Sequence, residues 1–509
     1  MTLLIYITEE SSVRMVLQLV SRMKLRYGNQ NFYCIAYTST VKNKIKELDK
    51  EELFSKIFTQ SDTNIEQNDP LSNEEKIKIA SIEKDYSRET IWNYVYQDRH
   101  LTFTKSGFLF SYGSKHKRNT QLRTIIKRFI YVEKIFEDIK PDLLFYATHD
   151  YGTSIAAIAW EVASRIRLPI YVPNYAKYES NFILNTDIYG EFPEFSEQFA
   201  INYADKAFNI NEETIDYLSK FQSNNKQAFY IDRSELQTPK VVGRRVLSFC
   251  KLLMLNKSKN KDHLRVSGLK IIKDKIIVSR RLNSLKNNNV FEAFDKKTKE
   301  TFVLFPLHFE PELVLLLQSQ PFLNQLNVIQ HIARNLPNNV ILYVKENPTS
   351  AGRRKLSYYE KIKSIPNVKL IGGDVNSIDV MKEALGVITI IGTSGIEAFL
   401  LGKPVITLSN TNYNFLPSII NCKNYNRLPS YVRGFSGYKL NRHEQLVFLQ
   451  TLIDLSINVN LVELFKDVND KGVTDRNEED IDRYFDFICQ YIDRTPSTSY
   501  RAENEPHKN

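Results

Sequence analysis

The stretch Val387-Ile-Thr-Ile-Ile-Gly-Thr-Ser-Gly-Ile-Glu-Ala-Phe-Leu-Leu-Gly-Lys-Pro-Val-Ile-Thr-Leu408 decides the fold of the second half of this chain. It opens with a short apolar run over residues 387–391, whose β-branched side chains predict a buried parallel strand. A turn of small residues follows, then a helix over residues 396–401 that ends at Gly402, then a second strand over residues 405–408. Strand, turn, helix and strand together form a βαβ unit.

The turn of this unit has the composition of an anion-binding site. Gly392, Thr393, Ser394 and Gly395 place backbone N–H groups and the positive end of a helix dipole at the carboxyl edge of a sheet, where phosphates bind readily. An alternative stays open, because Ser394 and Glu397 also have the spacing of a capping box that only satisfies the helix start. If Thr393 is the cap instead, the carboxylate of Glu397 is available to accept hydrogen bonds from ribose hydroxyls.

The composition describes a globular chain with anionic partners. At 509 residues the chain exceeds one hydrophobic core and predicts two domains, and 42% hydrophobic and 25% charged residues are ordinary for a soluble protein. The net charge of +10 favours nucleic acid, acidic lipid, nucleotide sugar or acidic glycan as partner. No stacking aromatic residues accompany the basic segment in a recognisable motif, so nucleic acid is not expected.

Cysteine spacing and the amino terminus point to a protein kept inside the cell. The four cysteines have no Cys-x-x-Cys spacing and are expected to be reduced thiols, neither a disulfide framework nor a zinc site: Cys34, Cys250, Cys422 and Cys489. The first residues have the pattern of a strand rather than of a signal peptide. No apolar run approaches the roughly 18 residues that span a bilayer. We therefore expect a cytoplasmic protein.

Strands and helices alternate along both halves of the chain, which predicts an α/β protein with two Rossmann-like domains. The expected division is an N-terminal Rossmann-like acceptor and catalytic domain (1–240), a basic linker region (241–299), a C-terminal nucleotide-sugar-binding domain (300–440), C-terminal helices (441–495) and a disordered tail (496–509). Residues 41–100 are expected to form helices joined by polar loops.

The first domain carries one candidate reactive segment. Residues 143–147 predict a buried strand, and Thr148, His149 and Asp150 follow at its carboxyl end, before a helix over residues 153–165. Ligands of open α/β sheets bind at the carboxyl ends of strands, so an Asp and a His are well placed there for chemistry. In the alternative interpretation, Asp150 or Thr153 is only the cap of the following helix.

The basic region contains a segment of mixed character. Residues 244–257 combine apolar and basic side chains at helical spacing. One interpretation is a helix that lies on an anionic membrane surface. The other is an ordinary helix with its apolar side in the core and its basic side in water.

Three segments of the second domain together resemble the capsule polysaccharide biosynthesis family of GT-B glycosyltransferases, which includes bacterial β-Kdo transferases that use CMP-Kdo. They are Phe305-Pro-Leu-His-Phe-Glu-Pro-Glu312, Leu342-Tyr-Val-Lys-Glu-Asn-Pro348 and Gly392-Thr-Ser-Gly-Ile-Glu-Ala-x4-Gly-Lys-Pro-Val405. The similarity covers about residues 300–410, and over the first domain it extends only to the layout. The resemblance implies a GT-B-like fold, with two Rossmann-like domains facing across a cleft and C-terminal helices.

The resemblance also implies which residues bind the donor. The turn holds the phosphates and Glu397 holds the ribose, and the full donor-binding set is Glu310, Glu312, Lys345, Asn347, Pro348, Gly392, Thr393, Ser394, Gly395, Glu397 and Lys403. The sequence departs from the family at Asn347, where the family usually has a His that contacts the donor phosphate. Asn can still donate a neutral hydrogen bond, but it cannot become cationic.

The chemistry follows from where charge develops. When the bond between the anomeric carbon and phosphate breaks, negative charge grows on the departing phosphate, and backbone N–H groups, the helix dipole and a Lys can stabilise it. No Asp-x-Asp stands at a strand end, so no metal is expected. In the related transferases an acidic residue of the first domain attacks the sugar, and Asp150 has the matching place, beside His149. His308 is a candidate base or phosphate contact; the alternative is a loop His hydrogen-bonded to backbone.

The sequence thus predicts a metal-independent GT-B glycosyltransferase of capsular or other surface polysaccharide synthesis. It would transfer a sugar, with Kdo from CMP-Kdo as one candidate, to a glycan or lipid-linked acceptor, without a further cofactor. Peripheral contact with the inner face of the cell membrane is a further expectation from the basic region. Two alternatives remain: a non-transferring relative such as a UDP-sugar 2-epimerase, and a non-catalytic GT-B-like module that binds glycans or partner proteins.

Overall fold

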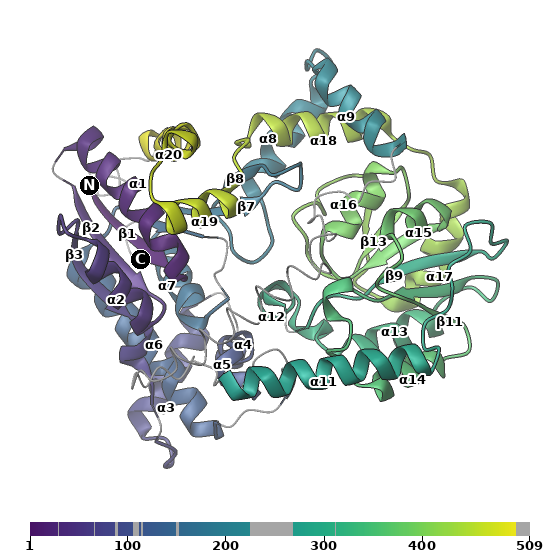
Figure 1. Ribbon diagram of the computed structural model, residues 1–509, viewed down its shortest axis with the longest axis horizontal. Helices are drawn as coiled ribbons and strands as arrows, with labels where there is room; N and C mark the ends of the chain where they lie inside the picture. Colours follow the sequence, from purple (N-terminus) through teal and green to yellow (C-terminus); the bar gives the residue numbers. More distant parts are fainter. Residues whose placement is uncertain are drawn as a thin grey trace. The chain divides into compact units, whose positions relative to one another are not determined.

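The chain forms two compact units (Figure 1). Unit 1 comprises Met1–Thr102, Ser114–Phe195 and Leu452–Asn509, and unit 2 comprises Phe103–Gly113 and Ser196–Thr451. The computed structural model describes residues 1–28, 30–65, 67–86, 90–104, 111–112, 116–148, 152–223, 268–310 and 312–494. The predicted helix over residues 244–257 and the predicted tail 496–509 lie outside these described residues.

Unit 1 is built on a six-stranded sheet with the order β3-β2-β1-β6-β7-β8. Neighbouring strands are parallel except for the antiparallel pair of β7 and β8. The strands are β1 (Thr2–Ile7), β2 (Asn31–Ala36), β3 (Phe54–Thr59), β6 (Leu143–Tyr146), β7 (Ile170–Tyr175) and β8 (Phe182–Asn185). Both faces of this sheet are covered by helices, which is why β6 and all but the first residue of β1 are buried.

Residues from the two ends of the chain share one hydrophobic core in unit 1. Alternate residues of β1, such as Leu3 and Ile5, pack with α1 (Val13–Tyr27), α2 (Ser39–Leu48), α19 (Leu461–Lys471) and α20 (Asp475–Asp493). The remaining helices of this part are η1 (Glu10–Ser12), η2 (Gln60–Thr63), α3 (Asn73–Asp85), α4 (Ile91–Gln97), α5 (Arg99–Thr102), α6 (Arg118–Ile139) and α7 (Ser154–Arg165). The carboxyl-terminal helices therefore complete the domain that the amino terminus begins.

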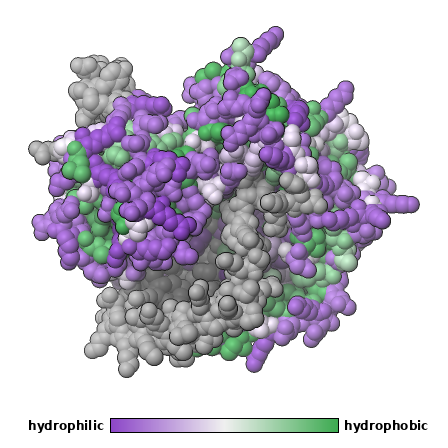
Figure 2. Space-filling view, turned by 45° about the horizontal axis from the view of Figure 1, so that its top comes forward, coloured by the Kyte–Doolittle hydropathy of each residue, from purple (hydrophilic) through white to green (hydrophobic). Residues whose placement is uncertain are grey.

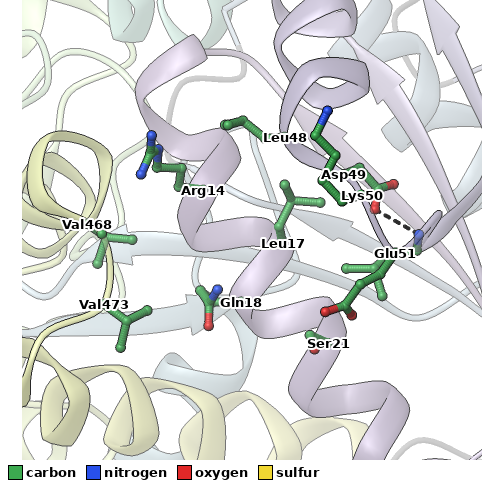
Figure 3. Close-up of a pocket in the computed structure, with 12 residues that line it drawn as sticks. Arg14, Leu17, Gln18, Ser21, Leu48, Asp49, Lys50, Glu51, Val468 and Val473 are labelled. Carbon is green, nitrogen blue, oxygen red and sulfur yellow. Dashed lines mark hydrogen bonds between the residues drawn. The ribbon is translucent and has the colours of Figure 1, made fainter.

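A cavity of about 410 Å³ lies in unit 1 beside α1. Figure 3 shows Arg14, Gln18 and Ser21 along this helix, with Val468 and Val473 opposite them. Residues that follow α2 also line it: Asp49, Lys50, Glu51 and Leu53. The cavity includes none of the predicted site residues.

Unit 2 is built on a second six-stranded sheet with the order β11-β10-β9-β12-β13-β14, in which all neighbouring strands are parallel. Its strands are β9 (Phe302–Pro306), β10 (Ile341–Lys345), β11 (Val368–Ile371), β12 (Gly386–Thr389), β13 (Val405–Thr407) and β14 (Ile419–Asn421). The order runs outward from β9 in one direction and from β12 in the other. This is the arrangement of a doubly wound, Rossmann-like domain.

Alternate residues of these strands pack against helices on opposite faces. Val303 and Phe305 belong to a core with α13 (Gln325–Arg334), α14 (Leu356–Lys363) and α17 (Leu428–Gly434). Leu285 of α11 (Gly268–Asn287), within the predicted basic linker region, joins the same core. In Figure 1, α15 (Ser377–Glu383) and α16 (Thr393–Leu400) cover the other face of this sheet.

The remaining elements of the second half are mostly helical. They are α8 (Pro193–Ala204), α9 (Glu212–Ser223), α12 (Leu313–Gln318), η4 (Gln320–Phe322), η5 (Pro348–Ser350), η6 (Tyr425–Arg427), η7 (Phe435–Gly437) and α18 (Arg442–Asp454). A short antiparallel pair, β4 (Phe103–Thr104) and β5 (Ser111–Tyr112), stands apart from both sheets. Two of the boundaries between the units fall within α8 and α18, and the others flank the segment Phe103–Gly113.

The predicted fold class is confirmed, since both halves carry a mainly parallel sheet between helices and the chain ends in helices. One local prediction was wrong: residues 41–100 are not only helices and loops, because Phe54–Thr59 forms β3. This is an edge strand whose second and third residues are exposed, so its polar residues hid the strand pattern.

The surface is predominantly hydrophilic. Figure 2 shows hydrophobic residues in small separate areas among hydrophilic ones. The most exposed large hydrophobic side chains, Leu25 at 85% and Ile77 at 70%, lie on different helices. Among the described helices, none combines the length and apolar character needed to cross a membrane. Three cysteines of the described chain, Cys34, Cys422 and Cys489, are buried free thiols, as predicted, while Cys250 lies outside it.

Candidate functional site

The candidate site lies at the carboxyl edge of the unit 2 sheet, where β9 and β12 are neighbours. The connections from these two strands lead to opposite directions in the strand order, so the loops after them diverge at this edge. Crevices at such switch points are where ligands of open α/β sheets bind. The loop after β9 carries His308 and Glu310, and the loop after β12 carries Gly392.

The first turn of α16 has no side-chain cap. Gly392 is the N-cap residue, with φ +124° and ψ 179°, a conformation that only glycine adopts readily. The helix begins at Thr393, and its N-cap residue makes no side-chain cap hydrogen bond. Neither the capping box of Ser394 and Glu397 nor a Thr393 cap is therefore formed. The amide end of this helix keeps its capacity to bind an anion.

Tyr413 closes one side of this turn. Its hydroxyl donates to the carbonyl of Gly392 at 2.7 Å. A Cβ atom at Gly395 would lie 2.7 Å from Cζ of Tyr413, so the first turn approaches the phenol ring as only glycine allows. Burial, together with the nearby carboxylate of Glu397, raises the pKa of Tyr413, which keeps the phenol protonated as a donor.

His308 connects the two loops of the switch point. Its Nε2 donates to the carbonyl of Ile391, and its backbone N–H donates to Oε1 of Gln325 at 2.8 Å. The side chain packs on the turn, since a Cβ at Gly392 would lie 3.2 Å from Nε2. Burial and the positive charge of Arg354 lower the pKa of His308 to about 4. His308 is thus neutral at pH 7. Its Nε2 makes the hydrogen bond to backbone that the alternative interpretation of a loop His expects.

An ion pair that sequence reasoning missed lies behind His308. Arg354 Nη1 is 2.6 Å from Oε1 of Glu346, and Arg354 Nη2 donates to the carbonyl of His308 at 2.6 Å. Glu346 also accepts hydrogen bonds from the hydroxyl of Tyr359 and from the backbone N–H of Asn347, each at 2.6 Å. Both charged side chains are at least nine-tenths buried. Burial opposes the charge on Arg354, but Glu346, Glu310 and the neighbouring tyrosines together outweigh this and raise its pKa.

Two predicted carboxylates lie beside this pair. Glu310 accepts a hydrogen bond from Gln325 Nε2 and is 3.6 Å from Arg354 Nη2. Burial raises the pKa of Glu310, although Arg354 opposes this. Glu312 is the N-cap residue of α12 and makes no side-chain cap there. Glu310 thus lies with His308 at the switch point. Glu312 lies two residues further along the chain, at the start of α12.

The segment after β10 has a structural explanation for its departure from the family. Lys345 is 2% exposed, and its Nζ donates to the carbonyl of Glu346 at 3.4 Å. Oδ1 of Asn347 accepts hydrogen bonds from the backbone N–H of Thr349 at 2.9 Å and from its hydroxyl at 2.6 Å. Pro348 then opens η5. Asn347 therefore caps the turn that brings Glu346 and Arg354 together.

Lys403 is the one predicted donor-binding residue of the unit 2 set that the structure places elsewhere. It follows the end of α16 and precedes β13, at the amino edge of the sheet. Its Nζ donates to the carbonyl of Ala384 at 3.0 Å, and burial lowers its pKa. Eight helical residues separate it from the start of α16, a rise of roughly 12 Å. Its sequence neighbourhood suggested the site, but the helix carries it to the other edge.

The predicted catalytic segment of unit 1 is described only in part. Thr148 Oγ1 is 2.6 Å from Thr8 Oγ1, at the carboxyl ends of β6 and β1, which are neighbours in the sheet. Thr153 caps α7 through its hydroxyl, which accepts from the backbone N–H of Ala156, so the capping alternative holds for Thr153. His149 and Asp150 lie outside the described residues, and their roles stay predictions.

A buried ion pair supports the start of α7. Arg128 Nη1 is 2.6 Å from Oδ2 of Asp98, and the same carboxylate oxygen accepts from the backbone N–H of Ser154 at 3.2 Å and from its hydroxyl at 3.0 Å. Both charged side chains are almost fully buried. Within the described residues, no group of three or more His, Cys, Asp or Glu is arranged to hold a metal ion.

The fold and this edge define a protein with two Rossmann-like domains and an uncapped helix start at a switch point. Residues 251–416 match the family described as "Capsule polysaccharide biosynthesis protein". The resemblance of the three sequence segments to this family is thus confirmed over the matched residues.

Individual proteins match this chain over a short segment or with low sequence identity. Over 130 residues the chain is 31% identical to "Protein FixF" of Sinorhizobium fredii, an alignment that covers 25% of this chain and 31% of FixF. The chain therefore spans about a third of the length of this curated relative. Among solved structures, UDP-GlcNAc 2-epimerase of Methanocaldococcus jannaschii has 15% identity and a TM-score of 0.25, covering 89% of this chain and 99% of that one. The β-Kdo 2,7 transferase of Thermosulfurimonas dismutans KpsC has 14% identity and a TM-score of 0.30, covering 72% and 95%.

Proposed function

We propose that this protein is a GT-B glycosyltransferase of capsular or other surface polysaccharide synthesis, and that its unit 2 binds a nucleotide-sugar donor. The observation that carries the proposal is the uncapped start of α16 at the switch point, with Gly392 as N-cap and the family match over the same segment. The amides of Thr393 and Ser394 and the helix dipole favour an anionic group at this place. A nucleotide phosphate is the anion that this family context supplies.

The proposed reaction breaks the bond between the anomeric carbon and the phosphate oxygen, and the electron pair leaves with the nucleotide phosphate. The amide end of α16 stabilises the charge that develops there. In the two-step form implied by the family resemblance, a carboxylate, assigned to Asp150, attacks the anomeric carbon. An acceptor hydroxyl then attacks the anomeric carbon, the bond to the Asp150 oxygen breaks, and the released carboxylate takes the hydroxyl proton. The proposal requires no metal ion at either step, because backbone dipoles offset the phosphate charge.

The finer parts of the proposal concern donor, acceptor and location. CMP-Kdo is the first donor to test, and UDP-linked sugars are the second. The proposed acceptor is a glycan or a lipid-linked glycan. We also propose that the protein acts on the cytoplasmic side, with the basic region 241–299 contacting an anionic membrane. Mixing with vesicles that contain anionic lipid, at low and high salt, tests this contact.

Two rival functions make different predictions. A UDP-sugar 2-epimerase releases UDP or an altered sugar from the donor without any acceptor. A non-catalytic module binds the nucleotide sugar and releases nothing. The turn made by Asn347, in place of the usual His, is compatible with all three, so the sequence departure does not choose among them.

The test uses the purified full-length protein with a panel of nucleotide sugars, including CMP-Kdo and UDP-linked sugars, each with and without a glycan acceptor. Nucleotide release that depends on the acceptor is the expected result. Release or sugar conversion without an acceptor favours the epimerase, and binding without release favours the module. Failure of every nucleotide and nucleotide sugar to bind overturns the proposal.

A further inference from the structure

Two buried polar atoms of the switch-point cluster lack a hydrogen-bond partner in the described structure: Nδ1 of His308 and Nε of Arg354. Their residues are in direct contact, because Arg354 Nη2 donates to the carbonyl of His308. Buried polar atoms in folded proteins nearly always have a partner. Two unsatisfied atoms on contacting side chains at a sheet edge therefore point to a partner group that the described residues do not supply.

The hydrogen bonds already made fix what each atom can do. The carbonyl of Ile391 only accepts, so Nε2 of His308 carries the hydrogen. A second proton on the ring is opposed by burial and by the charge of Arg354, which leaves Nδ1 as an acceptor. The two Nη atoms of Arg354 are engaged with Glu346 and with the His308 carbonyl, which leaves Nε–H as a donor.

One acceptor and one donor together select the chemistry of the missing group. A hydroxyl donates and accepts at the same time, whereas a phosphate oxygen only accepts and an ammonium only donates. The charge of Arg354 is already balanced by Glu346 at 2.6 Å, with Glu310 at 3.6 Å, so the pair offers little unbalanced positive charge to an anion.

We propose that Nδ1 of His308 and Nε of Arg354 together bind one hydroxyl group of the ligand held at this edge. This inference rests on the proposed function, since it assigns the hydroxyl to the nucleotide sugar. The hydroxyl belongs either to the ribose or to the transferred sugar. The amide end of α16 binds the phosphate, and His308 and Arg354 favour ligands that carry a hydroxyl group.

The variants that test this separate the two ring nitrogens. In His308→Gln the amide takes the place of Nε2 and keeps the bond to Ile391, but the Nδ1 acceptor is lost. In His308→Asn the amide takes the place of Nδ1. Arg354→Lys keeps a positive charge beside Glu346 and removes Nε–H. His331→Gln, an exposed position on α13, is the matched control.

Calorimetric titration of the full-length protein with CMP, UDP, their 2′- and 3′-deoxy forms, CMP-Kdo and a UDP-linked sugar identifies the source of the hydroxyl. If it is a ribose hydroxyl, His308→Gln and Arg354→Lys each weaken the free nucleotides about tenfold, and one deoxy nucleotide binds the variants and the wild type equally. If it is a sugar hydroxyl, the variants bind free nucleotides normally and only the nucleotide sugars weaken. In both cases His308→Asn binds better than His308→Gln. Equal affinities of all proteins for all ligands overturn the inference and leave a structural water as the partner.

A second measurement keeps the inference separate from the proposed function. The ¹⁵N resonance of His308 Nδ1, assigned by its absence in His308→Gln, is followed while a free sugar (ribose, Kdo or N-acetylglucosamine) or sodium sulfate is added. The expected result is a shift with at least one of the sugars and none with sulfate, even if no nucleotide binds. A shift with sulfate alone shows an anion site and contradicts the hydroxyl assignment, and no shift with either contradicts it as well.

Discussion

The hydroxyl of Tyr413 donates to the carbonyl of Gly392 at 2.7 Å, and this bond holds the turn from which α16 begins. The two residues come from different loops at the carboxyl edge of unit 2, since Gly392 follows β12 and Tyr413 follows β13. Because the phenol occupies the space beside Gly395, the turn can lie this close to Tyr413 only with glycine at this position. The proposed phosphate contact depends on this arrangement.

Gly395→Ala is expected to disturb this turn. The added Cβ would overlap the hydroxyl end of the buried Tyr413 ring, so either the ring or the first turn of α16 must move. We expect a loss of about 1–3 kcal/mol in the free energy of unfolding and a roughly tenfold weaker nucleotide affinity. Urea denaturation and calorimetric titration measure the two effects. Gly437→Ala is the control, because nothing lies within 4 Å of its added Cβ; equal behaviour of the two variants would count against the turn.

Stability is expected to fall on the acid side because of His308. Its pKa in the folded protein is about 4, against an ordinary value near 6.5, so below pH 6.5 the unfolded chain binds a proton that the folded one does not. The contribution is complete above pH 6.5 and is lost as the pH falls toward 4, by up to about 3 kcal/mol.

Comparison of the wild type with His308→Gln isolates this effect, since the other titrating groups are common to both. The unfolding free energy of the wild type should drop more steeply between pH 6.5 and 4. Parallel pH profiles would show that His308 is not held neutral in the fold.

Glu346→Gln is expected to be strongly destabilising. It removes the charge that balances the buried guanidinium of Arg354 at 2.6 Å, and breaking one side of a buried ion pair costs about 3–5 kcal/mol. Glu300→Gln breaks the pair with Lys369, whose side chains are about one-third exposed, and should cost about 1 kcal/mol or less. Chemical denaturation of both variants decides the matter, and similar costs would mean that the Arg354 pair is not the support of this edge.

Asp150→Ala should abolish acceptor-dependent turnover while leaving nucleotide affinity nearly unchanged, because its proposed role is attack on the sugar and not donor binding. Asp138→Ala, at an exposed position of α6, is the control and should be active. Circular dichroism and calorimetry accompany the assay. A folded, nucleotide-binding Asp150→Ala protein with normal turnover rules out the assignment, and an unfolded one assigns Asp150 a structural role.

The sequence predicted the architecture well where patterns are local. The strand over Val368–Ile371 and the stop of α16 at Gly402, with φ +76°, are as expected, because apolar runs and glycines act on their own neighbourhood. The start of α16 lies three residues earlier than predicted. Gly392 alone supplies the bend, so Thr393, Ser394 and Gly395 already belong to the helix.

The candidate site was predicted only in part. The ends of buried strands can be predicted from where their apolar runs stop. These strand ends located His308, Glu310 and the turn at Gly392. Arg354 has no such signal, since it lies beyond the strand in a loop and meets Glu346 and His308 only through tertiary packing. Lys403 is the opposite case. It is close to the turn in sequence, but the two turns of α16 between them place its side chain at the other edge of the sheet.

In the proposed function a nucleotide phosphate rests on the amide end of α16. A crystal structure of the full-length protein soaked with CMP or UDP tests this placement. We expect a phosphate oxygen within hydrogen-bond distance of the backbone nitrogens of Thr393 or Ser394. A nucleotide bound elsewhere, with this helix start unoccupied, would contradict it.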